Sequence, residues 1–311
     1  MLCQVQKCYS YAKRWKRILI IDTNYTGSTS FKDKFSNYFN TKETDIYLDT
    51  DEFTALESMS LYPGFLQGRI NTYKIEWNIS VNNFVDCTTQ QSLKLNFDKD
   101  YTEQVVLHHS AGGGEKSVRA FAWLRLNQIM LDELSFRIEK IGNRYTAIHI
   151  RHTDYKTDYK KRIQSLARKI AGPVYIASDN KEVIAYCVQV FGKARTHTFS
   201  RLPKQAGKRI HIDDAEDGLL PFDMNKDAIA DLFTLALSEK LYFFQIQANN
   251  NKNKYSGFSR LAKNIHLSNL FISAIGGAKS VSKINPHRKI WTIATSKLIY
   301  IIYNHYYRLL Y

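Results

Sequence analysis

Cysteine and long apolar runs are both scarce in this chain of 311 residues. The four cysteines (Cys3, Cys8, Cys87 and Cys187) are scattered and form no C-x-x-C pair, which argues against a disulfide framework and a zinc site and favours a reducing compartment. No run approaches the roughly 20 apolar residues of a membrane-spanning helix. No apolar segment typical of a secretory signal is visible at the start. We therefore expect a cytoplasmic protein.

Acidic residues are outnumbered, because 44 lysines and arginines stand against 29 aspartates and glutamates and give a formal net charge of +15. Such a charge suits a nucleic acid, an anionic membrane surface or a phosphate-rich ligand. One basic cluster lies at 160–169, and another lies in the tail at 276–311, which contains no aspartate or glutamate. A solvated surface is the ordinary explanation for both clusters.

The spacing of apolar residues predicts an α/β fold. A helix is expected at Leu2–Arg17, and the apolar run Ile18–Ile21 is typical of a strand covered on both faces. A long amphipathic helix is expected at Val118–Ile138, and a boundary near residue 140 fits two α/β domains. Beyond it we expect strands at Tyr145–Ile150, Pro173–Ala177 and Lys240–Gln247 and helices at Lys160–Ile170, Glu182–Phe191, Ala228–Ser238 and Phe258–Ser273.

Charged side chains follow two of these strands. Arg151 and Asp154 come after the first strand and Asp179 after the second. Because ligands of open α/β sheets bind beyond the carboxyl ends of the strands, Arg151 is placed to pair with a diphosphate and to offset charge on a departing nucleotide. Asp154 could hold the guanidinium in one rotamer. The alternatives are a surface arginine and, for Ser178 or Asp179, simple capping of the next helix.

Ser256 and Ser259 stand at the start of another predicted helix. Hydroxyl residues there accompany free backbone N–H groups that can bind an anion, although N-capping alone would also explain them. The motifs at Arg151, Asp179 and Ser256 follow one another along the chain, and each offers a group that a nucleotide diphosphate can bind. Together they favour a nucleotide site.

The segments that carry these residues resemble the successive motifs of the α-1,6-fucosyltransferase superfamily, which includes the nodulation and core-fucosylating enzymes. They are Ala147–Asp154, Val174–Asn180, Asp231 within its helix, and Ser256–Ile265. The resemblance covers roughly residues 145–267, with a weaker similarity at Leu2–Asp22.

The resemblance implies a GT-B-like α/β fold, in which two Rossmann-like domains face a cleft. The acceptor-side domain would be 1–140 and the nucleotide-sugar domain 141–275, followed by a basic, aromatic tail at 276–311. It also implies inverting, metal-independent transfer from GDP-fucose. By position, the catalytic residues are Arg151 and Asp154, and the donor-binding residues are His149, Asp179, Asp231, Ser256 and Ser259.

Two departures from the family pattern are visible. His152 stands where the family often has a second arginine, so the phosphate clamp is weaker or differently shaped. No glycine loop precedes the first predicted helix, which affects contacts expected from the N-terminal domain. An inactive, degenerate transferase is therefore one alternative.

Two acidic clusters suggest a rival, metal-dependent mechanism. Asp49, Asp51 and Glu52 could hold a divalent cation against a diphosphate, as could the cluster Asp213–Asp217, although solvated turns are simpler explanations. The segment Gly112–Ser117 is not a P-loop, because Glu115 replaces the glycine that precedes the lysine.

The sequence thus predicts a glycosyltransferase that uses a GDP-sugar, without a metal or other cofactor, on a hydroxyl of a glycan or lipid-linked oligosaccharide. The acceptor base is not identified, and Asp22 at the end of the first strand is a candidate. The tail at 276–311 fits either peripheral contact with the inner face of a membrane or packing against the N-terminal domain. Nucleic acid is not expected, because stacking aromatics are not interleaved with the basic residues. The alternatives are another nucleotide-sugar donor, or a non-catalytic basic protein that binds nucleic acid or anionic lipid.

Overall fold

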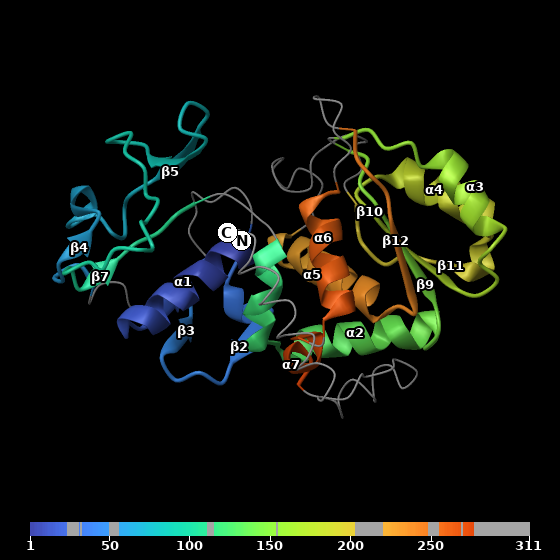
Figure 1. Ribbon diagram of the computed structural model, residues 1–311, viewed down its shortest axis with the longest axis horizontal. Helices are drawn as coiled ribbons and strands as arrows, with labels where there is room; N and C mark the ends of the chain where they lie inside the picture. Colours follow the sequence, from blue (N-terminus) through green and yellow to red (C-terminus); the bar gives the residue numbers. More distant parts are fainter. Residues whose placement is uncertain are drawn as a thin grey trace, which may run out of the picture.

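The computed structural model describes residues 1–23, 31, 33–49, 56–110, 115–153, 155–202, 220–247, 255–268 and 270–276. The described chain forms an elongated α/β molecule (Figure 1), with small N-terminal strand pairs at one end and a larger parallel sheet at the other. In the described ranges, no helix is long and apolar enough to cross a membrane.

The N-terminal half begins with the predicted helix, α1 (Leu2–Trp15), which is confirmed. The strand that follows, β1 (Leu19–Ile21), pairs in parallel with β3 (Ile46–Leu48). The prediction that this strand is covered on both faces is wrong: Leu19 and Ile21 are buried, whereas Ile20 is 37% exposed. In the described part β1 belongs to a sheet of two strands, so only one of its faces packs on the core.

The remaining N-terminal elements are short. They are the antiparallel pairs β2 (Phe39–Thr41) with β8 (Leu124–Leu126) and β5 (Ile75–Asn78) with β6 (Asn83–Asp86), the parallel pair β4 (Leu61–Tyr62) with β7 (Val105–Val106), and the 3-10 helices η1 (Phe35–Asn37) and η3 (Gly64–Leu66).

The long helix expected at Val118–Ile138 is three elements instead. The 3-10 helix η4 (Glu115–Ala122) is followed by β8, and α2 (Gln128–Ile141) begins only after it. Asn127 sets this start, because its side chain accepts a hydrogen bond from the backbone N–H of Met130 at 3.1 Å. Pairing with β2 satisfies the backbone of β8, so a tertiary contact overrides the helical spacing.

The C-terminal half contains a four-stranded parallel sheet in the order β11-β10-β9-β12. Its strands are β9 (Thr146–Ile150), β10 (Val174–Ser178), β11 (Thr196–His197) and β12 (Lys240–Phe243). Ile150 pairs with Ser178, so the carboxyl ends of β9 and β10 meet at one edge of the sheet. The predicted strands are confirmed, although β12 ends four residues early.

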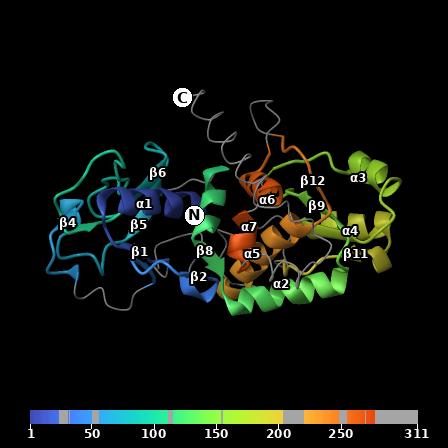
Figure 2. The same ribbon diagram turned by 60° about the horizontal axis from the view of Figure 1, so that its bottom comes forward.

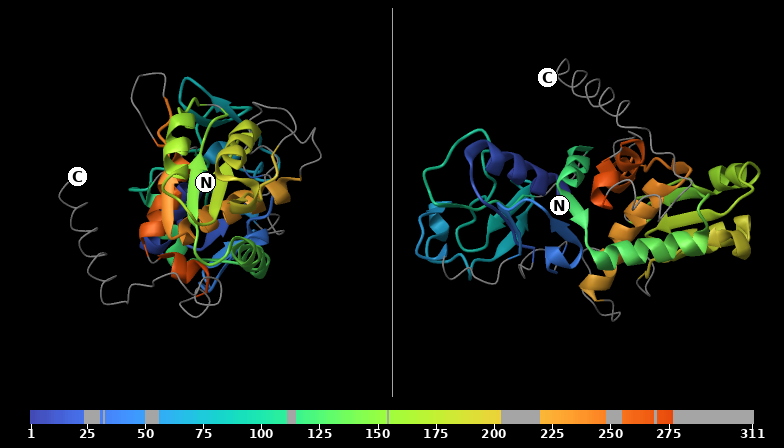
Figure 3. Two further views of the ribbon diagram at one scale, coloured as in Figure 1. Left: turned by 90° about the vertical axis from the view of Figure 1, so that its right-hand side faces the viewer. Right: turned by 90° about the horizontal axis from the view of Figure 1, so that it is seen from below.

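Helices cover both faces of this sheet (Figures 2 and 3). One face packs against α3 (Lys160–Ala167) and α4 (Lys181–Phe191), and the other faces α2, α5 (Pro221–Leu237) and α6 (Gly257–Leu267). Alternation along β9 explains this layering: Ile148 packs in the α3–α4 core, whereas Ala147 packs with α2 and α5. The helix expected at Phe258–Ser273 is two helices, α6 and α7 (Leu270–Ala274), and α5 begins at Pro221, earlier than predicted.

A single apolar core runs from the N-terminal half into the C-terminal half. It includes Val5 of α1, Leu134 of α2 and Leu235 of α5. The rings of Phe121 in η4 and Phe233 in α5 lie 5.1 Å apart in an edge contact. The division into two domains near residue 140, at the end of α2, stays a prediction.

Candidate functional site at the carboxyl edge of the parallel sheet

Arg151 and Asp179 lie directly beyond the carboxyl ends of β9 and β10. Because these strands are parallel neighbours in register, the residues that follow them are brought side by side. Arg151 Nε lies 3.9 Å from Asp179 Oδ2, and the two side chains are 25% and 17% exposed. Asp154, predicted to orient Arg151, lies outside the described residues.

Asp179 also holds the loop that follows β9. Its Oδ1 accepts a hydrogen bond from the backbone N–H of His152 at 2.8 Å, and its carbonyl accepts one from the Thr153 hydroxyl at 2.7 Å. The alternative that Ser178 or Asp179 caps α4 is wrong. Asn180 is the cap, and its Oδ1 accepts from the backbone N–H groups of two residues in the first turn. The Asp179 carboxylate therefore serves the loop and Arg151.

Thr157 is a member of this site that the sequence did not reveal. Its hydroxyl donates to the Arg151 carbonyl at 2.6 Å, and its backbone N–H donates to His152 Nδ1 at 3.1 Å. The buried Thr157 thus folds the loop back on itself and fixes the backbone of Arg151. His152, where the family often has a second arginine, serves here as an acceptor that orders the loop. The Arg151 guanidinium also lies 5.5 Å from the centre of the Tyr155 ring.

His149, Ser259 and Ser256 form a hydrogen-bonded chain beside Arg151. His149 Nδ1 lies 2.7 Å from Ser259 Oγ, which lies 2.9 Å from Ser256 Oγ. Ser256 is the N-cap of α6, and its Oγ accepts from the backbone N–H of Ser259 at 3.0 Å. The alternative, predicted from the sequence, that Ser256 caps this helix is confirmed. The cap lies where β9 and α6 meet.

The imidazole of His149 is neutral. Burial, reinforced by the positive charge of Arg151, lowers the pKa of His149 from 6.5 to about 3. A neutral imidazole carries one N–H, so its tautomer decides whether Nδ1 donates to Ser259 or accepts from it. The positive charge at this edge therefore comes from Arg151 and the N-terminus of α6, two features that bind phosphate groups.

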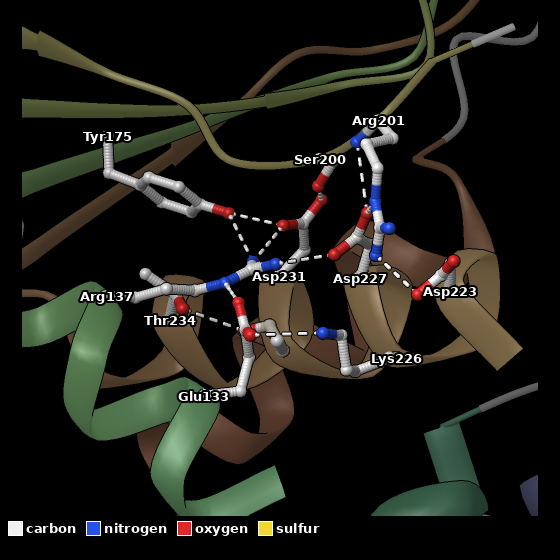
Figure 4. Close-up of polar contacts among 11 residues, drawn as sticks. Glu133, Arg137, Tyr175, Ser200, Arg201, Asp223, Lys226, Asp227, Asp231 and Thr234 are labelled. Carbon is white, nitrogen blue, oxygen red and sulfur yellow. Dashed lines mark hydrogen bonds and ion pairs between the residues drawn. The ribbon is translucent and has the colours of Figure 1, made fainter. Parts of the chain in front are cut away.

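Asp231, predicted as a donor-binding residue, lies in a different set of contacts on α5 (Figure 4). Its Oδ1 accepts from Arg137 Nη1 at 2.6 Å and from the Tyr175 hydroxyl, and its Oδ2 accepts from the Ser200 hydroxyl at 2.6 Å. Both carboxylate oxygens thus have protein partners. Burial raises the pKa of Asp231, although the Arg137 charge opposes this shift.

Arg137 organises this second set of contacts and was not anticipated from the sequence. Its side chain is completely buried and forms ion pairs with Glu133 at 2.7 Å and Asp227 at 3.0 Å, besides Asp231 (Figure 4). The only sequence signal is Glu133 four residues earlier on an otherwise apolar helix face. We call Arg137, Glu133, Asp227 and Asp231 the α2–α5 ion network.

The proposed metal ligands are only partly described. Asp49 Oδ1 and Oδ2 accept from the backbone N–H groups of Phe35 and Ser36 at 2.8 and 2.7 Å, so this carboxylate caps η1. Asp51, Glu52 and the cluster Asp213–Asp217 lie outside the described residues, as do Gly112–Gly114 and the tail beyond Gly276. Within the described ranges, no group of three or more histidine, cysteine, aspartate or glutamate side chains could hold a metal ion.

A parallel sheet between two helical layers, with basic and hydroxyl groups at its carboxyl edge, places the C-terminal half among the open α/β folds, whose ligands bind at that edge. The described structure is similar to that of NodZ α-1,6-fucosyltransferase soaked with GDP-fucose, with 14% identity and a TM-score of 0.53 over 85% of this chain and 87% of that one. It is also similar to NodZ co-crystallised with GDP and to NodZ from Bradyrhizobium, each with 14% identity and a TM-score of 0.51 over 84% of this chain and 87% of the other.

No protein-family model and no curated protein sequence matches the chain. The similarity to the NodZ structures nevertheless confirms the resemblance to the α-1,6-fucosyltransferase superfamily at the level of the fold.

Proposed function

We propose that this protein is a fucosyltransferase-like glycosyltransferase that moves fucose from GDP-fucose to a hydroxyl of a glycan or lipid-linked oligosaccharide, with inversion and without a metal ion. One observation carries the proposal: Arg151, Asp179, His149, Ser259 and Ser256 meet at the carboxyl edge of the sheet. The fold is shared with NodZ structures obtained with GDP-fucose and GDP, which supports the same donor.

In the proposed reaction, the bond between the sugar carbon and the β-phosphate oxygen breaks, and its electron pair stays on the departing GDP. The Arg151 guanidinium would offset the charge that develops there. Asp179 and Thr157 keep the Arg151 loop in place, so the guanidinium need not reorganise during the reaction. The Ser256 hydroxyl and the N-terminus of α6 would also bind the diphosphate.

The acceptor hydroxyl attacks the opposite face of the sugar carbon and loses its proton to a base. We propose that the N-terminal domain supplies the acceptor surface and this base. Asp22 is the candidate carboxylate, because it directly follows the carboxyl end of β1 as Arg151 follows that of β9.

Thermal unfolding with GDP, UDP or CMP, with and without EDTA, tests the donor site. We expect GDP to raise the melting temperature most and EDTA to leave that shift unchanged. Arg151→Ala should abolish the GDP shift and reduce fucosyl transfer by on the order of 10²–10³-fold, with little change in the melting temperature of the free protein.

Arg144→Ala is the matched control, because Arg144 is an exposed arginine that pairs with Glu239 away from this edge. Fucosyl transfer retained by Arg151→Ala would contradict the proposed role of Arg151 in stabilising the departing GDP. Protection by UDP or CMP would indicate another donor, and protection lost in EDTA would point to a metal ion.

A further inference from the structure

The first turn of α3 and the two residues that follow the helix form a basic surface. Its cations are Lys160, Lys161, Arg162, Arg168 and Lys169, and no aspartate or glutamate lies between residues 160 and 169. All five cationic residues are exposed, whereas Ile163 is buried in the α3–α4 core. We call these five residues the α3 basic face.

The charge of this face is not compensated by nearby carboxylates. Throughout the described chain, no carboxylate lies within ion-pair distance of any of the five cations, in contrast to Arg144, Arg151 and Arg201. Between Tyr155 and Arg195 there are nine lysines and arginines against three aspartates and glutamates, a net charge of +6 in the sequence. Asp158 and Glu182 are the exposed acids of this stretch.

Helix stability does not explain the position of three of these cations. Lys160, Lys161 and Arg162 occupy the first turn of α3, where the helix dipole favours acidic residues and disfavours basic ones. The N-cap, Tyr159, provides no side-chain hydrogen bond to offset this effect. Charges that oppose local stability point to a role in binding.

The contacts of these cations favour a flat anionic partner over a nucleic acid. Lys160 Nζ lies 5.6 Å from the centre of the Tyr186 ring, and the Arg162 guanidinium lies 5.8 Å from that of Phe244. The cations cover these rings, so neither ring is presented for stacking with a base. Eight helical rises separate Lys160 from Arg168, about 12 Å, which exceeds the size of a single phosphate ligand.

We propose that the α3 basic face docks this protein on a bilayer that contains anionic phospholipids. Tyr159, the residue before α3, connects this face to the carboxyl edge of the sheet, because its ring lies 5.1 Å from that of His152. A membrane in contact with α3 therefore lies beside the loop that carries Arg151. The docking surface does not depend on the identity of the sugar donor.

Co-sedimentation of the full chain with lipid vesicles tests the proposal. We expect binding to phosphatidylcholine vesicles that contain phosphatidylglycerol, weak binding to phosphatidylcholine alone, and a decrease with salt. Lys160→Glu/Lys161→Glu/Arg162→Glu should weaken partitioning by on the order of 100-fold, since each cation near an anionic surface contributes to binding. Glutamates suit the first turn of a helix, so the variant should melt no lower than the parent.

The matched control is Lys42→Glu/Lys74→Glu/Lys94→Glu, which makes the same change in net charge on exposed residues of the N-terminal half. This control should keep vesicle binding. Equal losses in both variants would overturn the proposal in favour of net charge alone. Unchanged binding by the α3 variant, or preference for an RNA oligonucleotide over the vesicles, would overturn it as well. GDP protection of the α3 variant, which the proposal leaves intact, separates this test from that of the donor site.

Discussion

Arg137 and Arg151 have opposite environments in this protein. The Arg137 side chain is completely buried and bonded to three carboxylates, whereas Arg151 is 25% exposed and 3.9 Å from Asp179. A buried, fully paired arginine compensates the buried carboxylates around it, whereas a partly exposed one at a strand end can still bind an anion. The difference lies in surroundings, because the two residues are chemically identical.

Three histidines link stability to pH. His108 Nδ1 accepts from the backbone N–H of Leu95 at 2.9 Å, and His109 Nε2 lies 2.6 Å from the Tyr73 hydroxyl. Burial lowers the pKa of His108 to about 3 and of His109 to about 4, as it lowers that of His149 to about 3. The unfolded chain, with a histidine pKa of 6.5, therefore binds more protons than the folded one below that pH.

We predict that the protein is most stable above pH 6.5 and loses stability as the pH falls toward 4, where the unfolded histidines are charged and the folded ones are neutral. Each histidine contributes up to about 1.4 kcal/mol per pH unit in this window. Urea unfolding at several pH values measures the slope. His149→Gln should give a shallower slope than the parent, and parallel curves would show that His149 is not buried as a neutral base.

At the scale of elements, the α2–α5 ion network joins two helices and the segment after β11. Arg137 comes from α2, and Asp227 and Asp231 come from α5. Arg201 Nε pairs with Asp227 at 3.1 Å, and Ser200 donates to Asp231, so the chain after β11 is held on α5 (Figure 4). Removing one partner leaves buried charges without compensation.

We predict that Arg137→Met lowers the free energy of unfolding by about 3–5 kcal/mol, because the buried Asp231 would lose its cation and Asp227 would keep only the partly exposed Arg201. Arg137→Met/Asp231→Leu should recover part of this loss, since it also removes the buried carboxylate that has lost its cation. Urea unfolding measures both. Arg144→Met, in an exposed ion pair, should have little effect. A loss for Arg137→Met no larger than that of the control would contradict the burial of the network.

The helix expected at Val118–Ile138 is wrong because a contact between distant parts of the chain decides the structure there. Apolar residues at Val118–Ile138 have helical spacing, yet Leu124–Leu126 pairs as a strand with Phe39–Thr41. The partner strand lies more than 80 residues earlier in the chain, so no local pattern reveals it. The elements β9, α3, β10 and α4 were predicted correctly, because each packs against its sequence neighbours.

At the scale of the whole molecule, one apolar core contains residues from both sides of residue 140. Tyr38 and Phe222 also stack across the two halves, with ring centres 5.6 Å apart. Shared burial couples the stabilities of the two halves, because neither can unfold without exposing apolar surface of the other.

We predict a single unfolding transition. When Trp291 is replaced by phenylalanine, tryptophan fluorescence reports on the N-terminal half alone, through Trp15, Trp77 and Trp123. Ile176→Ala, in the buried core under α3 and α4, should cost about 2–5 kcal/mol and lower the tryptophan fluorescence and circular dichroism midpoints equally. A fluorescence midpoint that does not move would show that the halves unfold independently.

The sequence by itself determined the alternation of strands and helices beyond Gly142 and the order of Arg151, Asp179 and Ser256 at the ends of those elements, because burial of apolar side chains at fixed spacing is a local property. Only the tertiary structure decided which groups touch. The His149–Ser259 bond joins residues 110 positions apart, and the Arg137–Asp231 pair joins residues 94 apart. The choice of Asn180 over Asp179 as the cap of α4 depends likewise on the loop that Asp179 holds from the neighbouring strand. Such pairings depend on how the strands and helices pack, so the spacing of residues along the chain does not specify them.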